Sequence, residues 1–388
     1  MYFQNKAYMF HFLKKYFQKS FQTLNTIIIS RKAILENLST YKSLSPEHSI
    51  FPVLKSNAYG HGIREVATIL QESKIDYIVV DSYYEALEVH KVNKTRVLLM
   101  GYTLPENFKY MDFSFITLVV SDFETLGTLG KIGKKIRIHL KIDTGMHRQG
   151  IYLEEISRFL STLQTYSNII LEGVCTHLAD ADNSDDSYTS VQIKKFQEAI
   201  TQITSAGFKL GYIHAANSAG GAKEFPSIFN AMRLGIGLYG INPLDSSDSS
   251  YGKLSKLRPA LRMESTLVLK KILQKGEKVS YNGTFIAPKN MTIGIIPVGY
   301  YEGIPRILGN EKFGYTWKDE YFPILGRVCM NMTIIDLGES SIKVGEKITI
   351  ISDNTNNPNS VSTMAHAAKT IPYECLTGIS ESIRRIVW

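Results

Sequence analysis

A lysine next to a turn-forming loop is the first feature of the chain that could do chemistry, in the segment FPVLKSNAYGHG at residues 51–62. The apolar residues before Lys55 predict a short buried strand over 51–55 that ends at this lysine. The loop that follows can bend sharply and bring the phenol of Tyr59 and the imidazole of His61 near the amine. A lysine at a strand end is usually solvated, but an amine held among such groups can move a proton or attack an aldehyde.

Other polar residues also lie in or directly after apolar runs that resemble strands. Each has an ordinary explanation when taken singly, such as a buried histidine, a surface ion pair or a helix cap. Residues that follow the strands of a barrel gather on one face, so their common placement favours a shared site. They are Asp143, Arg148, His177, Asn217, Ser218 and Arg233.

The residue types at these positions suit a ligand that carries a phosphate and an aldehyde. Ser218 lies at a predicted helix start, and with the backbone N–H groups of Gly235 and Ile236 it could bind a phosphate. The amine of Lys55 could form a Schiff base with an aldehyde. A phosphate and a Schiff base together indicate pyridoxal 5′-phosphate.

Eight short strand-like runs must position these residues, and most of them are separated by predicted helices at 63–73, 122–131, 153–163 and 190–206. Strands that alternate with helices predict a parallel sheet, and eight repeats in about 200 residues favour a (β/α)8 TIM barrel. An open doubly wound sheet is the alternative, but it would more naturally show a GxGxxG turn after its first strand. The runs are 51–55, 77–80, 97–100, 115–120, 136–142, 171–177, 212–216 and 231–234.

The sequence changes character after a polar segment at residues 245–256 (DSSDSSYGKLSK). Later runs such as MTIGIIPVGY and CMNMTIIDL are typical of strands and are separated by turn signals such as Asn282-Gly283. We therefore expect an α/β fold with a barrel over residues 21–255 and a smaller, mostly β domain over residues 256–388.

Residues 1–20 form a basic, aromatic N-terminal extension with four lysines and no acidic residue, which accounts for half of the net charge of +8. Phe10, Leu13, Phe17 and Phe21 have helical spacing and predict a docked surface helix, with a targeting peptide or a membrane-surface anchor as alternatives. Because the remainder is only mildly basic, we do not expect nucleic-acid binding.

The composition is that of an ordinary globular protein, with 44% hydrophobic and 21% charged residues. No apolar stretch reaches the roughly 18 residues that a membrane span needs. The three cysteines, Cys175, Cys329 and Cys375, are far apart, which suggests neither a disulfide framework nor a metal site. We expect a cytoplasmic protein with reduced thiols and no metal.

Several segments in chain order carry a family resemblance: VLKSNAYGHG, KIDTGMHRQG, THLADAD, ANSAG, RLGIGLYGINP, VSYNGTF, IPVGYYEGIPR, GRVCMNM and TIPYECLTGIS. From about residue 25 to the C-terminus the chain resembles the pyridoxal-phosphate-dependent alanine racemases. The resemblance implies a (β/α)8 barrel followed by a β domain, in agreement with the pattern of strands and helices. It also implies a homodimer with shared active sites.

Residue roles follow from the same resemblance. Lys55 would carry the cofactor and act as one catalytic base, and Tyr281 would be the opposite base, supplied by the partner subunit. Arg233 would face the pyridine nitrogen of the cofactor. The other implied cofactor-binding positions are Tyr59, His177, Asn217, Ser218, Gly235, Ile236 and Tyr373. Arg148 and the backbone of Met330 would hold the substrate carboxylate, and Lys141 would be the lysine that is carbamylated. The implied outer or entry positions are His214, Tyr300, Arg306 and Asn331.

Racemisation removes the α-proton of an amino acid and returns it to the other face, so two bases must flank the α-carbon. A lysine and a tyrosine can do this if a cationic, partly desolvated site lowers their pKa. Arg233 hardly deprotonates, so it would leave the pyridine nitrogen unprotonated and limit side reactions such as transamination.

Two positions depart from the family pattern. Met330-Asn331-Met332 stands where MDQ is usual, and Ser382 stands where an arginine is common. Asn331 motivates the alternative of a broad-specificity amino-acid racemase, while alanine racemisation that supplies D-alanine for peptidoglycan is the leading hypothesis. A third hypothesis is a non-catalytic protein that binds pyridoxal phosphate, but such a protein would be expected to lose Lys55 or Tyr281, and both are present.

Overall fold

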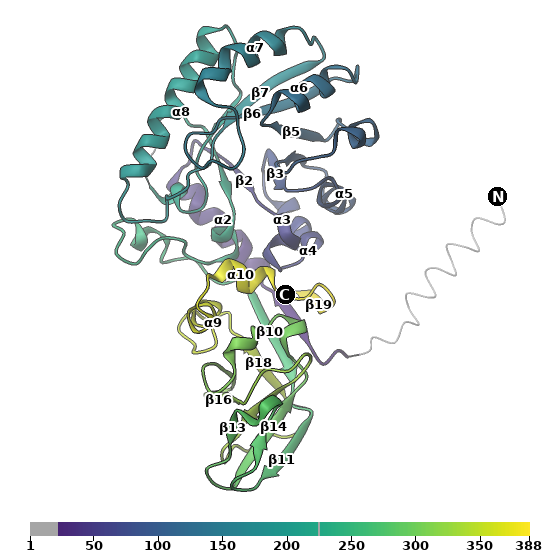
Figure 1. Cartoon of the computed structure of the whole chain (residues 1–388), viewed down its shortest axis with the longest axis vertical. Coiled ribbons are helices and arrows are strands. Elements are labelled where there is room, and N and C mark those ends of the chain that lie inside the picture. The colour runs from purple at the N-terminus through teal and green to yellow at the C-terminus, as the bar shows by residue number, and fades with distance from the viewer. Residues whose placement is uncertain (1–21, 224–225) are drawn as a thin grey trace, which may run out of the picture.

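The computed structural model describes residues 22–223 and 226–388, which form two large sheets with helices around one of them (Figure 1). The helix predicted through Phe10 and Phe17 lies outside these residues. In the part of the chain that is described, no helix is both long and apolar enough to cross a membrane.

The first sheet has eight strands, all parallel, in the order β2-β9-β8-β7-β6-β5-β4-β3. Its two edge strands meet through a parallel bridge between Val53 and Val79, where Leu54 N donates to Val79 O at 2.8 Å. The predicted (β/α)8 barrel is thereby confirmed, and each predicted run overlaps a strand. The strands are β2 (Ser49–Pro52), β3 (Tyr77–Val80), β4 (Arg96–Leu99), β5 (Ile116–Val120), β6 (Ile136–Lys141), β7 (Ile169–Cys175), β8 (Tyr212–His214) and β9 (Ala231–Leu234).

Helices surround the barrel, and local signals explain where they begin (Figure 1). Ser82 and Glu85 form a capping box at one helix start, and the side chain of Asp122 accepts from Thr125 N at another. The four predicted helices are confirmed as α4 with the 3₁₀ turn after it, α6, α7 with the 3₁₀ turn before it, and α8. The barrel helices are α2 (Arg31–Leu44), α3 (Lys55–Tyr59), α4 (Ile63–Ile69), α5 (Tyr83–Val92), α6 (Phe123–Gly130), α7 (Ile156–Gln164) and α8 (Ser187–Ser205).

The second sheet has nine strands in the order β11-β14-β17-β16-β15-β18-β10-β1-β19 and confirms the predicted β-rich C-terminal part. Its strands are β1 (Thr26–Ile29), β10 (Leu261–Thr266), β11 (Leu269–Leu273), β14 (Met291–Ile296), β15 (Gly314–Trp317), β16 (Glu320–Leu325), β17 (Thr333–Asp336), β18 (Lys347–Ile351) and β19 (Arg384–Val387). A separate hairpin is formed by β12 (Lys278–Val279) and β13 (Phe285–Ile286).

Strand β1 was not predicted, and it crosses the expected division of the chain. It precedes the barrel in sequence, yet it pairs antiparallel with β10 and parallel with β19 in the second sheet. The chain then enters the barrel through α2, whose first residue follows the N-cap Ser30. The β domain is therefore tied to the barrel at both ends of the barrel sequence.

The C-terminal part also contributes two helices, α9 (Val361–Ala368) and α10 (Pro372–Thr377). Helix α10 packs against α3, the short segment that begins at Lys55 (Figure 1). A side chain at Gly60 would meet Leu376 O at 2.1 Å, so the glycine permits this close approach. The C-terminal domain thus reaches the end of the barrel at which the predicted site residues gather.

Candidate active site

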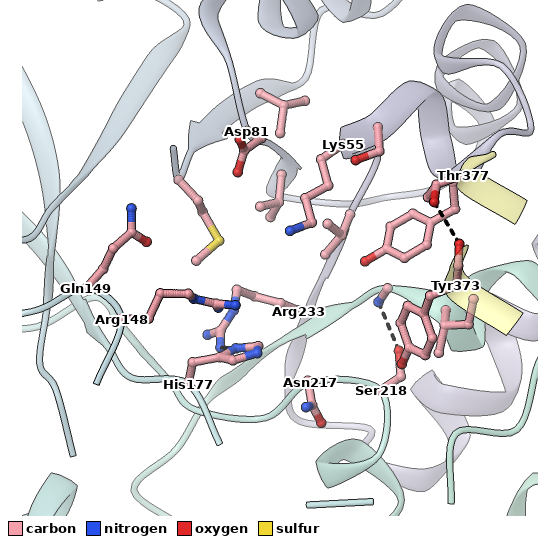
Figure 2. A pocket seen from close by; sticks show the side chains of 18 of the residues that line it. Lys55, Asp81, Arg148, Gln149, His177, Asn217, Ser218, Arg233, Tyr373 and Thr377 are labelled. Carbon is pink, nitrogen blue, oxygen red and sulfur yellow. Dashed lines mark hydrogen bonds between the residues drawn. The ribbon is translucent and has the colours of Figure 1, made fainter. Parts of the chain in front are cut away.

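A cavity of about 610 Å³ opens at the barrel end where the chain leaves β2, β3, β4, β6, β7, β8 and β9. Residues in or directly after these strands line it, and α10 covers one side (Figure 2). The cavity therefore lies where a (β/α)8 barrel carries its functional groups. The predicted site residues that line it are Lys55, Tyr59, Lys141, Arg148, His177, Asn217, Ser218, Arg233, Gly235, Ile236 and Tyr373.

Lys55 begins a left-handed turn, because the four residues after it have φ values between 52° and 55°. This conformation costs roughly 1–2 kcal/mol per non-glycine residue, so contacts from outside must hold the turn. Ser56 N donates to Glu85 Oε1 at 2.6 Å, and the guanidinium of Arg385 donates to Gly60 O at 2.9 and 3.0 Å. The half-buried Lys55 side chain consequently points its amine into the cavity (Figure 2).

The hydroxyl of Ser218 lies in a cradle of donors on the opposite side of the cavity. Its oxygen accepts from the backbone N–H groups of Gly235 at 3.0 Å and Gly237 at 3.1 Å, so its own proton remains available for a ligand. A Cβ at Gly235 would lie 2.8 Å from the hydroxyl oxygen of Tyr59 and 3.8 Å from that of Ser218. The missing side chain therefore leaves space between two hydroxyl donors, which suits an anionic oxygen.

Tyr59 is fixed in this cradle by two further aromatic rings. Its ring centroid lies 5.0 Å from that of Tyr239 and 6.0 Å from that of Tyr373. Burial raises the pKa of Tyr59 to about 12, so its hydroxyl keeps the proton at neutral pH. Tyr59 is thus a rigid hydrogen-bond donor.

Arg233 is held by acceptors around both of its terminal nitrogens. Nη1 donates to His214 Nδ1 at 2.6 Å and to His214 O at 3.1 Å. Nη2 donates to Thr176 O at 2.7 Å and Ala215 O at 3.0 Å, and lies 3.2 Å from His177 Nδ1. Over residues 22–223 and 226–388, the Nε–H group has no hydrogen-bond acceptor, so it remains free to donate to a ligand.

Another part of the cavity wall carries cationic side chains, although the carboxylate of Asp81 also lines the cavity. Lys141 Nζ donates to Gln149 Oε1 at 3.0 Å, and burial together with nearby Arg148 and Lys55 lowers the pKa of its amine. Burial, followed by the charges of Arg233 and Arg148, lowers the pKa of His177 to about 2, so its imidazole is neutral. A cavity with this charge favours a ligand that carries several negative groups.

Five predicted residues lie in the β domain and do not line this cavity in the single chain. They are Tyr281, Tyr300, Arg306, Met330 and Asn331, and all five are exposed. Of these residues, Tyr281, the predicted second base, is 64% exposed, and Met330 is 56% exposed. His214 is fully buried, and its Nδ1 lies 2.6 Å from Nη1 of Arg233, which lines the cavity.

Comparison with known proteins agrees with this geometry. Residues 29–243 match the family model described as "Alanine racemase, N-terminal domain", and residues 260–387 match "Alanine racemase, C-terminal domain". The alanine racemase of Lactobacillus acidophilus is 34% identical over 368 residues, which cover 92% of this chain and 95% of that protein. The chain belongs to the alanine racemase family.

Solved structures of the family have the same fold. The alanine racemase of Bacillus anthracis with bound L-Ala-P is 29% identical, with a TM-score of 0.87 over 95% of this chain and 96% of that one. The alanine racemase of Bartonella henselae with covalently bound pyridoxal phosphate is 22% identical and has a TM-score of 0.83, over 95% of this chain and all of that one. At 22% identity, the likeness to the Bartonella henselae structure concerns the fold alone.

The two departures from the family pattern have different surroundings. Asn331 Nδ2 donates to Glu302 Oε1 at 2.9 Å, and the other oxygen of this buried carboxylate accepts from Gly299 N at 2.8 Å. An aspartate at position 331 would face Glu302 with a like charge, so a local contact accounts for the amide. Ser382 is exposed, and its hydroxyl lies 2.8 Å from that of Ser380.

Sequence reasoning missed several residues that line the cavity, among them Asp81, Gln149 and Thr377. Asp81 directly follows β3, which is the same signal that identified Lys55. Thr377 lies four residues after Tyr373 on α10 and therefore on the same face of that helix. Gln149 and Thr377 both lie inside segments that carry the family resemblance, KIDTGMHRQG and TIPYECLTGIS.

Proposed function

We propose that this chain interconverts L-alanine and D-alanine, with pyridoxal 5′-phosphate held in the cavity at the barrel end. One observation carries the proposal: a single cavity combines the amine of Lys55, the Ser218–Gly235 cradle and the unpaired Nε–H of Arg233. These groups match an aldehyde, a phosphate and a pyridine nitrogen. The residues present therefore fit this cofactor.

Each side chain has a separate task in such a reaction. When bound, pyridoxal phosphate supplies an electron sink that makes the α-proton of an amino acid removable. Lys55 would hold the aldehyde carbon and afterwards exchange a proton with one face of the α-carbon. Arg233 would donate from Nε–H to the ring nitrogen, and because a guanidinium keeps its own proton, that nitrogen would stay unprotonated. Arg148 would attract the substrate carboxylate.

The second base would be Tyr281 from a partner subunit, in a homodimer with two shared sites. Two observations support this arrangement. The side chain of Tyr281 is 64% exposed, and it does not line the cavity that Lys55 lines. A base on the opposite face of a flat cofactor must come from elsewhere, and an isologous dimer supplies it twice.

Lys141 is a candidate for carbamylation. A neutral amine adds to the carbon of CO2 and loses one proton, which yields a carbamate anion in place of a cation. Burial and the neighbouring cations lower the pKa of the Lys141 amine, which favours the neutral form that reacts. Because Arg148 also lines the cavity, a carbamate would pair with it and hold it toward the substrate carboxylate.

Chiral analysis of the product tests the activity directly. Purified protein with pyridoxal phosphate should convert L-alanine to D-alanine and D-alanine to L-alanine, and Lys55→Ala should abolish both reactions. L-Serine, L-lysine and L-arginine should turn over more slowly, which separates alanine specificity from a broad-specificity racemase. Absence of racemisation by folded, cofactor-loaded protein would favour the non-catalytic alternative.

Mixing two inactive variants tests the shared site. A heterodimer of Lys55→Ala and Tyr281→Ala has one site with both bases and one with neither. Random reassociation of equal amounts makes about half of the dimers mixed, so activity should recover to roughly a quarter of the wild-type value. If mass-tagged chains show complete exchange and no activity returns, Tyr281 is not supplied by the partner subunit.

We further propose that the reaction takes place in the cytoplasm and supplies D-alanine for peptidoglycan. Cells that lack this chain should then require D-alanine in the medium. Growth without D-alanine, in cells with no other racemase activity, would contradict this role.

A further inference from the structure

A line of buried polar side chains runs from Arg233 through the interior of the barrel, away from the cavity. Arg233 Nη1 lies 2.6 Å from His214 Nδ1, and His214 Nε2 lies 2.8 Å from His139 Nδ1. His139 Nε2 then faces Glu172 Oε2 at 3.6 Å, which is longer than a hydrogen bond, and it has no hydrogen-bond partner among the described residues. Both imidazoles are fully buried, and the second one takes no part in the mechanism above.

The two ends of this line determine where the imidazole protons lie. Arg233 can only donate, so His214 Nδ1 must accept and His214 carries its proton on Nε2. That proton is donated to His139 Nδ1, so His139 in turn carries its proton on Nε2, toward Glu172. Burial lowers the pKa of both imidazoles, which keeps each of them neutral with a single ring proton.

Glu172 is the carboxylate that His139 Nε2 faces at the far end. The guanidinium of Arg96 donates to its two carboxylate oxygens at 3.0 Å each, and the hydroxyl of Tyr77 donates to Oε2. Burial alone would raise the pKa of Glu172, but its interactions with His139, Arg96 and Tyr77 lower it to about 2. The carboxylate therefore stays ionised and accepts hydrogen bonds across the physiological pH range.

We propose that Glu172 and His139 are positioning residues for Arg233, which fix the direction of one donor-to-acceptor chain from the guanidinium to the carboxylate. In this direction His214 Nδ1 always presents a lone pair to Arg233, so Nη1 stays bound and Nε–H remains the donor directed to the ligand. The reverse direction would place an imidazole N–H against a guanidinium N–H. The direction of the imidazole protons does not depend on the proposed function, and only the effect on the reaction rests on it.

The barrel makes room for this line of side chains. Gly173 pairs with His139 across β6 and β7, and a Cβ at this glycine would lie 3.0 Å from the ring atoms of His139 and 2.8 Å from Tyr212 O. The rings of Tyr77 and Tyr212 lie 5.6 and 5.7 Å from that of His139. Because these neighbours leave little freedom for the imidazole, its two nitrogens remain aimed at His214 and Glu172.

Nitrogen-15 NMR of ring-labelled histidine tests the proposal on apo-protein, without cofactor or activity. In the wild-type chain, His139 and His214 should both show a protonated Nε2 and an unprotonated Nδ1. Loss of one set of signals in His139→Gln assigns the resonances. A proton on Nδ1 of either residue, or a doubly protonated ring, would overturn the assigned direction without any further variant.

Two substitutions in the same cluster separate direction from packing. In Glu172→Gln, Arg96 takes the amide oxygen and the amide N–H faces His139 Nε2, which must then accept. His139 should move its proton to Nδ1, whereas Tyr77→Phe, which keeps the carboxylate, should leave both tautomers unchanged. Unchanged tautomers in Glu172→Gln, or the same change in Tyr77→Phe, would refute the role of the carboxylate.

The effect on the ligand is a separate measurement. In Glu172→Gln a second donor faces Arg233, so pyridoxal phosphate should bind about tenfold more weakly, while Tyr77→Phe should bind as wild type does. Equal affinity in Glu172→Gln and wild type would show that the tautomers do not control Arg233. Failure of the wild-type protein to bind the cofactor at all would instead contradict the proposed function, and the NMR result would stand.

Discussion

Replacing Gly235 with alanine should weaken binding of pyridoxal phosphate because the new methyl group would occupy the proposed phosphate position. Its carbon would lie 2.8 Å from the hydroxyl oxygen of Tyr59 and 3.5 Å from the ring carbon that bears it. Tyr59 cannot easily retreat, since the rings of Tyr239 and Tyr373 lie 5.0 and 6.0 Å away. A ligand oxygen between the Tyr59 and Ser218 hydroxyls would therefore lose at least one hydrogen bond.

The size of the effect follows from the charge of that oxygen. A hydrogen bond to a charged group contributes about 1.5–3 kcal/mol, which corresponds to an increase in Kd of about 10- to 150-fold. Titration of the apo-protein with pyridoxal phosphate and with pyridoxal, followed by absorbance, separates the phosphate from the ring. Gly235→Ala should weaken binding of the phosphorylated ligand and leave the affinity for pyridoxal unchanged.

The matched control is Gly127→Ala at a half-buried position of α6, where the nearest atom to the added Cβ is the Tyr166 hydroxyl at 3.8 Å. This variant should bind both ligands as wild type does. Two results would refute the reasoning about the cradle. One is an unchanged affinity of Gly235→Ala for pyridoxal phosphate, and the other is an equal loss of affinity for pyridoxal, which would place the fault in the ring site.

Three further predictions concern charge. Asn331→Asp should lower the free energy of unfolding by about 1–3 kcal/mol in a denaturant titration, because the new carboxylate replaces a donor to buried Glu302; an unchanged midpoint would contradict this contact. Glu172 has a folded-state pKa of about 2 against an ordinary value of 4.5, so its contribution to stability is complete above pH 4.5 and is lost as the pH falls toward 2. The free energy of unfolding of the wild type should therefore fall more steeply with decreasing pH in this range than that of Glu172→Gln. Parallel curves of stability against pH would argue against the lowered pKa of Glu172. Arg233→Glu should raise transamination relative to racemisation, because the fixed cation beside the ring nitrogen is gone; a constant ratio in folded protein would refute that role.

The barrel was predictable because its strands are short apolar runs that alternate with helices, and each run keeps its identity in the sequence. The partner strands of β1 were not predictable, because its sequence TIII would suit either sheet. Its partners β10 and β19 lie more than 200 residues away in the chain. Only three-dimensional pairing assigns this strand to the β domain.

Local backbone conformation limited the prediction of the site in a similar way. The loop after Lys55 was expected to bend, but four successive non-glycine residues at positive φ contradict their own propensities. Contacts from Glu85 and Arg385, both distant in sequence, stabilise that turn. Residues that act through others were also missed, since His139 and Glu172 meet only inside the closed barrel.

Reduction with borohydride tests the central claim most directly, because it makes the bond between the cofactor and its lysine permanent. Two lysines line the cavity, Lys55 and Lys141, and the lowered pKa of the Lys141 amine makes it the strongest competitor. Digestion and mass spectrometry of the reduced protein should find the pyridoxyl group on the peptide that contains Lys55. A pyridoxyl group on Lys141, or on any lysine outside the cavity, would contradict the account.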